Sequence, residues 1–408
     1  FFSVAIADKV RSYKIPVMKD LARQLQQRRQ QQLYRSRLVV ETPQGISVRI
    51  DNRDYLSFCS NDYLGLASHP DIVAAFHRGL DEFGAGSGAA HLISGHSRAH
   101  HALEEELAAF LQRPRALLFS TGYMANLGVM SALTGHGDRI FADHTDHASL
   151  LDGARLSGAR LLRYRHSDAD DLDTRLANAP AGEFLVATDG VFSMDGDIAP
   201  LQQLADVAAR HAAWLMVDDA HGLGVTGPDG RGTVAQAGLD ITQVPVLMGT
   251  LGKAVGTFGA FVAGSDDLIE TLIQEARTYI YTTASPPALA SATRVALRLV
   301  QEDSWRRERL RQLVSQFRHG ARQIGLELCD SPTPIQPLIV GAAAEALRLG
   351  KALREQGILI TAIRPPTVAE GKSRLRITFS AAHTEQHVER LLAVLEDTMV
   401  CGQASGRG

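Results

Sequence analysis

The sequence has few cysteines, few aromatic residues and no long hydrophobic run. Its 408 residues include three cysteines, Cys59, Cys329 and Cys401, which lie far apart and have no metal-ligand spacing. A sparse, odd set of this kind argues against a disulfide framework and is typical of a reducing compartment, so we expect a cytoplasmic protein. No stretch of 18 apolar residues occurs, and a membrane span is therefore not expected.

An excess of charge of one sign is also absent. Lys and Arg number 42 and Asp and Glu number 45, which gives a formal net charge of −3, and the two signs are interspersed. A nucleic-acid-binding protein would carry a basic stripe, so this class is disfavoured. Hydrophobic residues make up 45% of the chain, which excludes a disordered protein, and the length predicts two or three folding units.

Between residues 70 and 265, short apolar runs alternate with longer helix-like stretches such as 98–111 and 201–211. The runs are bounded by Gly, Asp or Ser, as expected for strands that are covered on both faces. The alternation predicts an α/β fold with a mostly parallel, seven-stranded sheet flanked by helices. The expected strands are 116–120, 139–142, 161–164, 184–188, 214–218, 244–248 and 258–262.

After residue 284 the pattern changes. A long helical region is expected from 286 to about 324, followed by strands at 335–340, 358–363 and 374–379 and helices at 344–356 and 384–399. This order predicts a smaller α+β C-terminal domain. The expected division is an upstream or non-native extension at 1–17 before a natural start near Met18, an N-terminal helix and strand segment at 18–69, a large domain at 70–285, a small domain at 286–400 and a tail at 401–408.

A carboxylate and a histidine follow the apolar run 214–217. Asp218, at the carboxyl end of a buried parallel strand, would face the crevice in which such sheets bind ligands. An isolated Asp at this position more often caps the next helix. His221 adds a second polar group at the same strand end, so we take Asp218 and His221 together as candidate site residues.

Lys253 lies among small and apolar residues in the segment 249–256, and an apolar strand follows it. Most lysines lie at the surface, but these neighbours predict burial, which lowers the pKa of the amine and makes it a nucleophile. The segment is similar to a nucleotide P-loop, but Ala254 stands where that motif requires Ser or Thr. An NTPase is therefore disfavoured, as is a nicotinamide enzyme, because a complete Gly-x-Gly-x-x-Gly context is missing.

A nucleophilic amine and a carboxylate at a strand end are the two groups that pyridoxal phosphate requires. The lysine would carry the cofactor as a Schiff base, and the carboxylate would keep the pyridine nitrogen protonated, so that the ring accepts electrons. Gly122 and Tyr123 begin an expected helix whose backbone N–H groups are suited to the phosphate. His147 would stack over a flat ring, although taken alone it would be a surface or helix-capping histidine.

Histidines are frequent between residues 91 and 147 and include His96, His100, His101, His144 and His147. No His-Glu-x-x-His or cysteine-rich pattern accompanies them, so the sequence predicts no metal site.

These segments together resemble fold-type I pyridoxal-phosphate enzymes, and more narrowly the α-oxoamine synthase family. The resemblance extends from about Leu25 to Val400 and includes residues 60–66, 103–107, 189–197 and 361–368. It implies that Lys253 binds the cofactor, that Asp218 pairs with the pyridine nitrogen and that His221 contacts the phenolic oxygen. One departure is Asp189, which stands where the family pattern has Glu.

The resemblance adds further positions to the expected site. Those implied for the cofactor are Gly122, Tyr123, His147, Ser193 and Thr250. Those implied for substrate are Arg35, Asn61, Arg364 and Thr367. His147 would stack on the ring, and Gly122, Tyr123 and Thr250 would bind the phosphate. Asn61 and Arg364 would bind the amino-acid carboxylate.

Members of this family condense an amino acid with an acyl thioester and release CO2 and the thiol carrier. Likeness around 335–341 and 362–368 favours L-alanine and a pimeloyl thioester, in biotin biosynthesis, with coenzyme A or acyl carrier protein as carrier. Glycine with an acetyl or succinyl thioester, and serine with a long acyl chain, remain alternatives. An inactive partner subunit is disfavoured because Lys253, Asp218 and His221 are all present. The resemblance also implies a homodimer in which residues 281–285 reach the neighbour's phosphate.

Overall fold

The computed structural model describes residues 19–405, so the expected extension at 1–17 and the last three residues lie outside it. The chain divides into two compact units, residues 1–38 and residues 39–408. In the first unit the described residues form helix α1 (Leu21–Gln30). Asp20 caps this helix by accepting a hydrogen bond from the N–H of Arg23, and none of the helix residues is buried.

The second unit contains a seven-stranded sheet in the order β3-β9-β8-β7-β6-β4-β5. Its strands are β3 (Arg115–Phe119), β4 (Arg139–Asp143), β5 (Arg160–Tyr164), β6 (Phe184–Asp189), β7 (Trp214–Asp218), β8 (Val246–Thr250) and β9 (Ala260–Gly264). Strand β9 is antiparallel to both of its neighbours, and the other strands run in one direction. The predicted mostly parallel, seven-stranded sheet is confirmed, and each strand end lies within two residues of its expected position.

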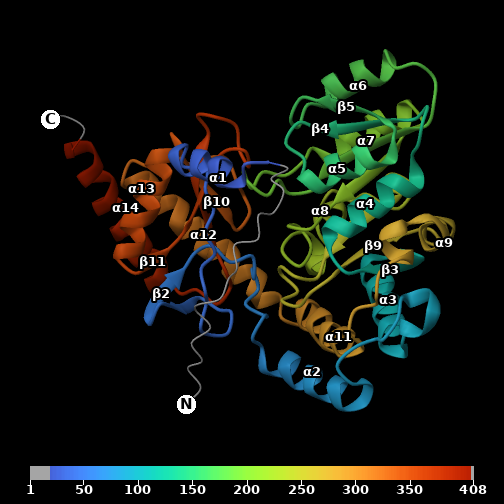
Figure 1. The fold of residues 1–408 in the computed structure, drawn as a ribbon, viewed down its shortest axis with the longest axis horizontal. Coiled ribbons are helices and arrows are strands. Elements are labelled where there is room, and N and C mark those ends of the chain that lie inside the picture. The colour runs from blue at the N-terminus through green and yellow to red at the C-terminus, as the bar shows by residue number, and fades with distance from the viewer. Residues whose placement is uncertain (1–18, 406–408) are drawn as a thin grey trace. The chain divides into compact units, whose positions relative to one another are not determined.

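Helices cover both faces of this sheet (Figure 1). The flanking helices are α3 (Arg98–Leu111), α4 (Gly122–Leu133), α5 (Ala148–Ser157), α6 (Ala169–Ala177), α7 (Leu201–Arg210), α8 (Thr233–Gln236), α9 (Asp266–Glu275) and α10 (Arg277–Ile280). Successive side chains of a strand point to opposite faces. In β7, Leu215 and Val217 therefore pack in one hydrophobic cluster and Met216 in another. Both faces of the sheet are buried, as its apolar strands require.

The C-terminal region forms a smaller α+β assembly around the sheet β10-β13-β12. Its elements are α11 (Pro287–Glu302), α12 (Ser304–Gln323), β10 (Ile335–Gly341), α13 (Ala343–Glu355), β11 (Ile358–Leu359), β12 (Thr361–Ile363), β13 (Ser373–Thr378) and α14 (Glu385–Ser405). The expected helical region 286–324 is two helices separated at Asp303. The expected strand 358–363 is also two, because β11 pairs with β2 and β12 pairs with β13.

The N-terminal strands of the second unit join this C-terminal region. Strands β1 (Ser47–Ile50) and β2 (Arg53–Ser57) form a hairpin, and β11 extends it into a third sheet. Helix α2 (Pro70–Phe83) packs against α11, which also packs against α3. The domain boundary at residue 285 therefore stays a prediction, since α11 contacts elements of the expected large domain.

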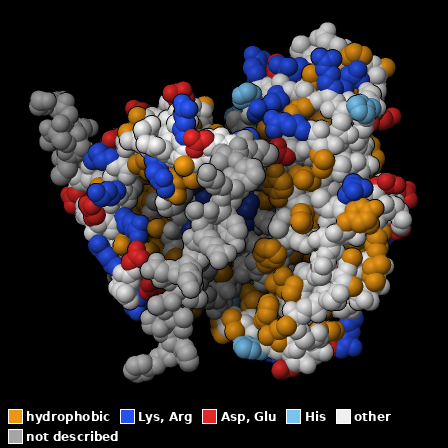
Figure 2. Space-filling model, viewed as in Figure 1, with side chains coloured by type: hydrophobic (Ala, Val, Ile, Leu, Met, Phe, Trp, Pro, Cys, Tyr) orange, Lys and Arg blue, Asp and Glu red, His pale blue; other side chains and the backbone are white. Residues whose placement is uncertain are grey.

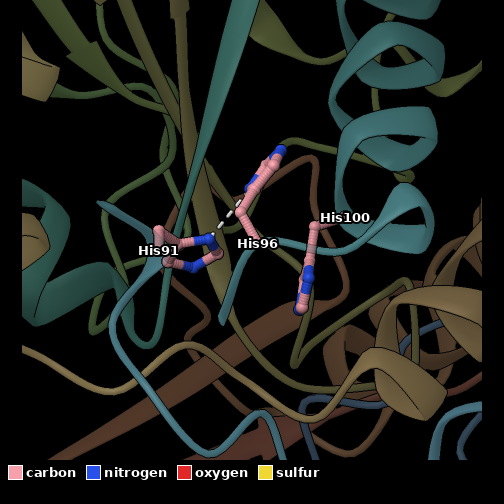
Figure 3. Close-up of side chains that lie close together, drawn as sticks. All are labelled: His91, His96 and His100. Atoms are coloured by element: carbon pink, nitrogen blue, oxygen red, sulfur yellow. Dashed lines mark hydrogen bonds between the residues drawn. The ribbon is translucent and has the colours of Figure 1, made fainter. Parts of the chain in front are cut away.

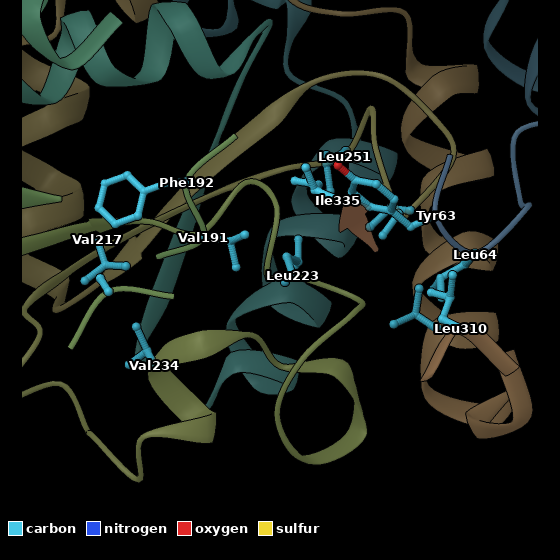
Figure 4. Close-up of a cluster of buried hydrophobic side chains, with 14 of the residues drawn as sticks. Tyr63, Leu64, Val191, Phe192, Val217, Leu223, Val234, Leu251, Leu310 and Ile335 are labelled. Carbon is cyan, nitrogen blue, oxygen red and sulfur yellow. The ribbon is translucent and has the colours of Figure 1, made fainter. Parts of the chain in front are cut away.

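One hydrophobic cluster connects the two regions of the second unit. Figure 4 shows it running from Val217 in the large sheet past Ile335 on β10, Tyr63 and Leu64 to Leu310 on α12. Because one continuous core holds both regions, the strand ends of the large sheet keep a defined position against the small sheet. None of the described helices is both long and apolar enough to cross a membrane.

Candidate active site

A cavity of about 1160 Å³ lies where the large sheet faces the small one. Its walls come from residues that follow β4, β6, β7 and β8 and from residues on β10, β12 and β13. Carboxyl ends of parallel strands are where open α/β sheets bind ligands. Six of the residues expected from the sequence line this cavity: Asn61, His147, Ser193, His221, Lys253 and Thr367.

The amine of Lys253 is the central group of the cavity. Its Nζ lies 2.8 Å from Nε2 of His221. Burial lowers the pKa of Lys253 to about 8, although the carboxylates of Asp218 and Asp189 oppose this shift. Burial and the neighbouring Lys253 also lower the pKa of His221 well below its ordinary value. The His221 ring is therefore neutral at physiological pH and carries a single N–H.

The hydrogen bonds of Tyr63 indicate which nitrogen of His221 carries that hydrogen. The Tyr63 hydroxyl donates to Oδ1 of Asn61 at 3.2 Å and lies 2.7 Å from Nδ1 of His221. A hydroxyl whose proton is used in this way accepts a hydrogen from Nδ1, which leaves a lone pair on Nε2 facing Lys253. Arg376 on β13 donates to Asn61 Oδ1 at 3.1 Å and to the carbonyl of Ser193 at 2.6 Å. The small sheet thus holds two of the expected site residues in place.

Asp218 ends β7, and its side chain is 4% exposed. Its Oδ1 accepts a hydrogen bond from the N–H of Ala220 at 3.0 Å, and its Oδ2 accepts one from Nδ2 of Asn126 at 2.7 Å. The same Nδ2 donates to Oγ of Ser149 at 2.8 Å, and that Oγ lies 2.7 Å from Nδ1 of His147. A chain of hydrogen bonds therefore connects the His147 ring to the buried carboxylate.

Asp189 lies beside Asp218 in the sheet, because the two residues are register partners of β6 and β7. Its Oδ2 accepts a hydrogen bond from the N–H of His147 at 3.1 Å. Burial, and then the adjacent charge of Asp218, raise the pKa of Asp189 well above its ordinary value. Asp189 therefore fixes the backbone at His147, while the low-dielectric site favours one negative charge rather than two.

The residues expected to bind a phosphate lie at the start of helix α4 and at the end of strand β8. Gly122 begins α4, and a methyl group added to it would lie 3.4 Å from Met248 on β8. Thr250 ends the same strand, and its hydroxyl donates to the carbonyl of Gly259 at 3.0 Å. The Tyr123 hydroxyl donates to the carboxylate of an α5 aspartate. The start of α4 thus lies close to the end of β8.

Several of the other residues expected from the sequence do not line the large cavity. The lining of the large cavity does not include Asp218, Gly122, Tyr123, Thr250 or Arg364. Arg364 follows β12 and is half-buried, whereas Thr367 is exposed at the cavity wall. Arg35 belongs to the first unit, whose position relative to the cavity is not defined. The roles expected for these residues stay predictions.

Four residues of the site were missed by sequence reasoning: Tyr63, Asn126, Ser149 and Arg376. Asn126 had a signal in the sequence, because it is a polar amide within the otherwise apolar stretch 124–130. In the structure its side chain is fully buried. Tyr63 lies in the segment 60–66 but would be taken as a core aromatic. Arg376 is buried in a strand where alternation predicts a solvent-facing cation, and its partners come from distant segments.

The donor set of this site fits pyridoxal phosphate. Lys253 offers an amine of lowered pKa, and Asp218 offers a buried carboxylate one strand away. The start of α4 offers backbone N–H groups of the kind that bind phosphate. The buried Oδ1 of Asn126, beside Asp218, has no hydrogen-bond partner among the described residues, so the polar site has capacity left for a bound group.

Comparison with known proteins agrees with this chemistry. Residues 53–395 match the family model of aminotransferases class I and II. The chain is 64% identical to 8-amino-7-oxononanoate synthase of Nitrosococcus oceani over 372 residues, which cover 91% of this chain and 99% of that protein. Its fold is similar to serine palmitoyltransferase from S. paucimobilis with a bound pyridoxal phosphate–myriocin adduct (31% identity, TM-score 0.89, covering 95% and 98%). It is also similar to 8-amino-7-oxononanoate synthase of Francisella tularensis (33% identity, TM-score 0.75, covering 86% and 99%).

The fold and the site define the class of the protein: it is a fold-type I enzyme whose cofactor is pyridoxal phosphate. Within that class, the chain belongs to the 8-amino-7-oxononanoate synthase family of acyltransferases.

Proposed function

We propose that the enzyme condenses L-alanine with a pimeloyl thioester and releases 8-amino-7-oxononanoate, CO2 and the free thiol carrier, as a step of biotin biosynthesis. The 64% identity to a relative named 8-amino-7-oxononanoate synthase supports this reaction. The serine palmitoyltransferase neighbour is only 31% identical. The observation that carries the proposal is the Lys253 amine. It has a pKa of about 8 and lies 2.8 Å from His221 at a cavity of about 1160 Å³.

Pyridoxal phosphate, when bound, supplies a carbonyl carbon for the substrate amine and an electron-accepting ring that stabilises negative charge at Cα. Lys253 would hold the cofactor, Asp218 would face the ring nitrogen, and the start of α4 with Thr250 would hold the phosphate. The buried carboxylate of Asp218 would keep a proton at that nitrogen, because an anion in a low-dielectric site strongly favours a cation beside it.

The amine of Lys253, which would be freed when the alanine amine takes its place on the cofactor, then moves the proton at Cα of alanine. An amine with a pKa of about 8 is partly neutral at physiological pH, so it accepts this proton and later returns it. A base whose pKa lies near the working pH contributes about 10²–10⁴-fold in rate. The Nε2 lone pair of His221 orients the amine, and the Tyr63 hydroxyl fixes the His221 ring.

The cations at the cavity suit two carboxylated substrates. Arg376 contacts Asn61, and both residues line the cavity together with Lys372 and Arg374. Arg374 also pairs with Asp195 at 2.5 Å, so its charge is partly compensated. We propose that Asn61 and Arg364 bind the alanine carboxylate, that Arg35 and Thr367 contact substrate and that Ser193 contacts the cofactor. The large volume of the cavity is suited to a long acyl chain.

Release of free thiol tests the reaction. The purified, cofactor-loaded protein would be offered L-alanine, glycine or L-serine, each combined with an acetyl, succinyl, pimeloyl or palmitoyl thioester. We expect turnover confined to L-alanine with the pimeloyl thioester, and Lys253→Ala as the inactive control. Comparison of pimeloyl-coenzyme A with pimeloyl-acyl carrier protein identifies the carrier. Faster turnover of glycine or serine with another thioester would contradict the proposed substrates but not the cofactor chemistry.

We also propose that the enzyme is a homodimer in the cytoplasm. Large hydrophobic side chains are exposed on the second unit, including Ile93 (80%), Tyr281 (71%) and Phe258 (54%). On the face that Figure 2 shows, hydrophobic side chains gather over the part of the second unit that carries the large sheet. Exposed apolar surface of this kind supports an interface between subunits. The two cysteines described, Cys59 and Cys329, are unpaired, which supports a reducing compartment. Light scattering after gel filtration tests the dimer.

A further inference from the structure

A group of histidines lies around a second cavity, of about 430 Å³, which shares no lining residue with the proposed active site. His91, His96, His101 and Glu104 all line this cavity. They come from the π-helical turn η1 (His91–Gly95), from the residues that follow it and from the first two turns of α3. Their spacing in the sequence matches no metal-binding motif, and the sequence accordingly predicts no metal here. Folding brings their side chains together nonetheless.

Two overlapping sets of three residues have ligand atoms within 4.8 Å of one another, and they share His96. One set contains His91 and His100, and the other contains His101 and Glu104. Figure 3 shows the first set, in which the hydrogen bond joins His91 to His96. Both nitrogens of His100 are already engaged, because Nδ1 accepts from the N–H of Ser97 at 3.1 Å and Nε2 lies 2.8 Å from the carbonyl of Ser285. His100 is therefore a structural residue, and the set with His101 and Glu104 is the better donor set.

The His91 side chain orients His96 for binding a metal ion. Nδ1 of His91 lies 3.0 Å from Nδ1 of His96, so one of the two nitrogens donates to the other. When His96 is the donor, its Nε2 carries a lone pair that is directed toward Glu104. Histidines that bind metals almost always donate their other ring N–H to an acceptor in this manner.

The spacing of the ligand atoms suits a small divalent cation. Nε2 of His96 lies 3.8 Å from Oε2 of Glu104. Tetrahedral zinc with bonds of about 2.0–2.1 Å holds its ligand atoms roughly 3.4 Å apart. The His96–Glu104 pair must therefore close by a few tenths of an ångström, and the ligand atom of His101, which lies within 4.8 Å of the other two, by up to about 1.4 Å. The other oxygen of Glu104 accepts a hydrogen bond from the N–H of Leu118 at 3.0 Å, which holds the carboxylate in place. His101 contributes from the exposed side, where its contact with Glu105, at 3.5 Å, is solvated and readily exchanged.

The nearby cation is compensated. Arg115 also lines this cavity, but its guanidinium lies 3.3 Å from Glu270 and 4.0 Å from Asp266 on α9. These two acidic partners offset part of the Arg115 charge beside Glu104.

We propose that His96, His101 and Glu104 form a Zn²⁺ site with a fourth position open to water in the 430 Å³ cavity. Two imidazoles and one carboxylate are an established zinc donor set with an open position. The ion would connect the segment that follows η1 to α3 and so stabilise this edge of the large sheet.

Isothermal titration of ZnCl2 into the cofactor-loaded protein, after treatment with chelator and dialysis, tests the site. We expect one ion per chain, and a loss of affinity of at least about tenfold in His101→Ala and in Glu104→Gln. Glutamine keeps an oxygen for the N–H of Leu118, and His101 is exposed, so both variants should fold. His77→Ala, at another exposed histidine on α2, is the matched control and should bind zinc as the unmodified protein does.

Two further measurements separate this site from other sources of zinc binding. The same stoichiometry is expected with the cofactor removed, because pyridoxal phosphate can itself bind metals. Zinc should also raise the melting temperature of the unmodified protein and of His77→Ala but not that of Glu104→Gln. Unchanged zinc affinity in His101→Ala, or an equal loss in His77→Ala, would overturn the proposal.

Discussion

Capture of pyridoxal phosphate by the cofactor-free enzyme should follow the ionisation of Lys253, with a midpoint near pH 8. A neutral amine attacks the cofactor carbonyl, whereas an ammonium has no lone pair. Burial disfavours the ammonium form and so lowers the pKa of Lys253 from 10.5, while Asp218 and Asp189 partly oppose the shift. The rate of capture should therefore rise through pH 8 and level off roughly one to two pH units above it.

The size of the effect follows from the two pKa values. Burial lowers the pKa from 10.5 to about 8. At about pH 7.5, roughly a quarter of the buried amine is neutral, compared with roughly 0.1% of an unperturbed lysine. Lys253 should thus react roughly 200-fold faster than a solvent-exposed lysine of the same intrinsic reactivity.

The assay mixes cofactor-free enzyme with pyridoxal phosphate and follows the visible absorbance of the lysine-bound cofactor across a series of pH values. Lys253→Ala, which should fold because it removes no large core volume, gives the background. A free lysine analogue gives the unperturbed reference. A midpoint near the ordinary lysine value, or equal capture by Lys253→Ala, would refute the reasoning.

Three other predictions concern the site and the core. Asp218→Asn should retain the visible colour but lose turnover by roughly 10²-fold or more, because a neutral amide does not hold the ring proton; because Asp218 raises the pKa of Lys253, the midpoint of capture should also move to lower pH. Asn126→Leu should weaken cofactor affinity, measured by equilibrium dialysis, because Asp218 loses a hydrogen bond of 2.7 Å, and unchanged affinity would contradict this. Gly79→Ala should lower stability by about 1–3 kcal/mol, because its methyl would lie 2.7 Å from Cα of Ala288. Thermal unfolding would check this against Gly135→Ala, where nothing lies within 4 Å.

The predicted strands of the large sheet were accurate because strand formation there depends on local pattern. Each strand is a short apolar run closed by polar or small residues, and burial on both faces requires that pattern. The C-terminal region was less predictable. Residues 358–363 form one apolar run, yet β11 and β12 join different sheets, because the partner of β11 is β2, some 300 residues earlier.

The candidate site divides in the same way. Lys253, Asp218 and His221 were found because each lies at or just after a strand end in a recognisable segment. Asn126 and Arg376 were not, since their roles depend on hydrogen bonds to residues 92 and 315 positions away. Sequence spacing carries no record of such contacts.

The sequence by itself determined the fold class, the family and the amine and carboxylate of the site, because these depend on local patterns and short motifs. The tertiary structure decided how low the pKa of Lys253 lies, since burial is a property of the whole fold. It also decided the division of the C-terminal strands between two sheets and the meeting of His96, His101 and Glu104 around one cavity. Long-range packing sets the burial and the strand pairing. The three histidine and glutamate ligands lie within residues 96–104, but the cavity they share is closed by distant residues such as Ile273 and Tyr279.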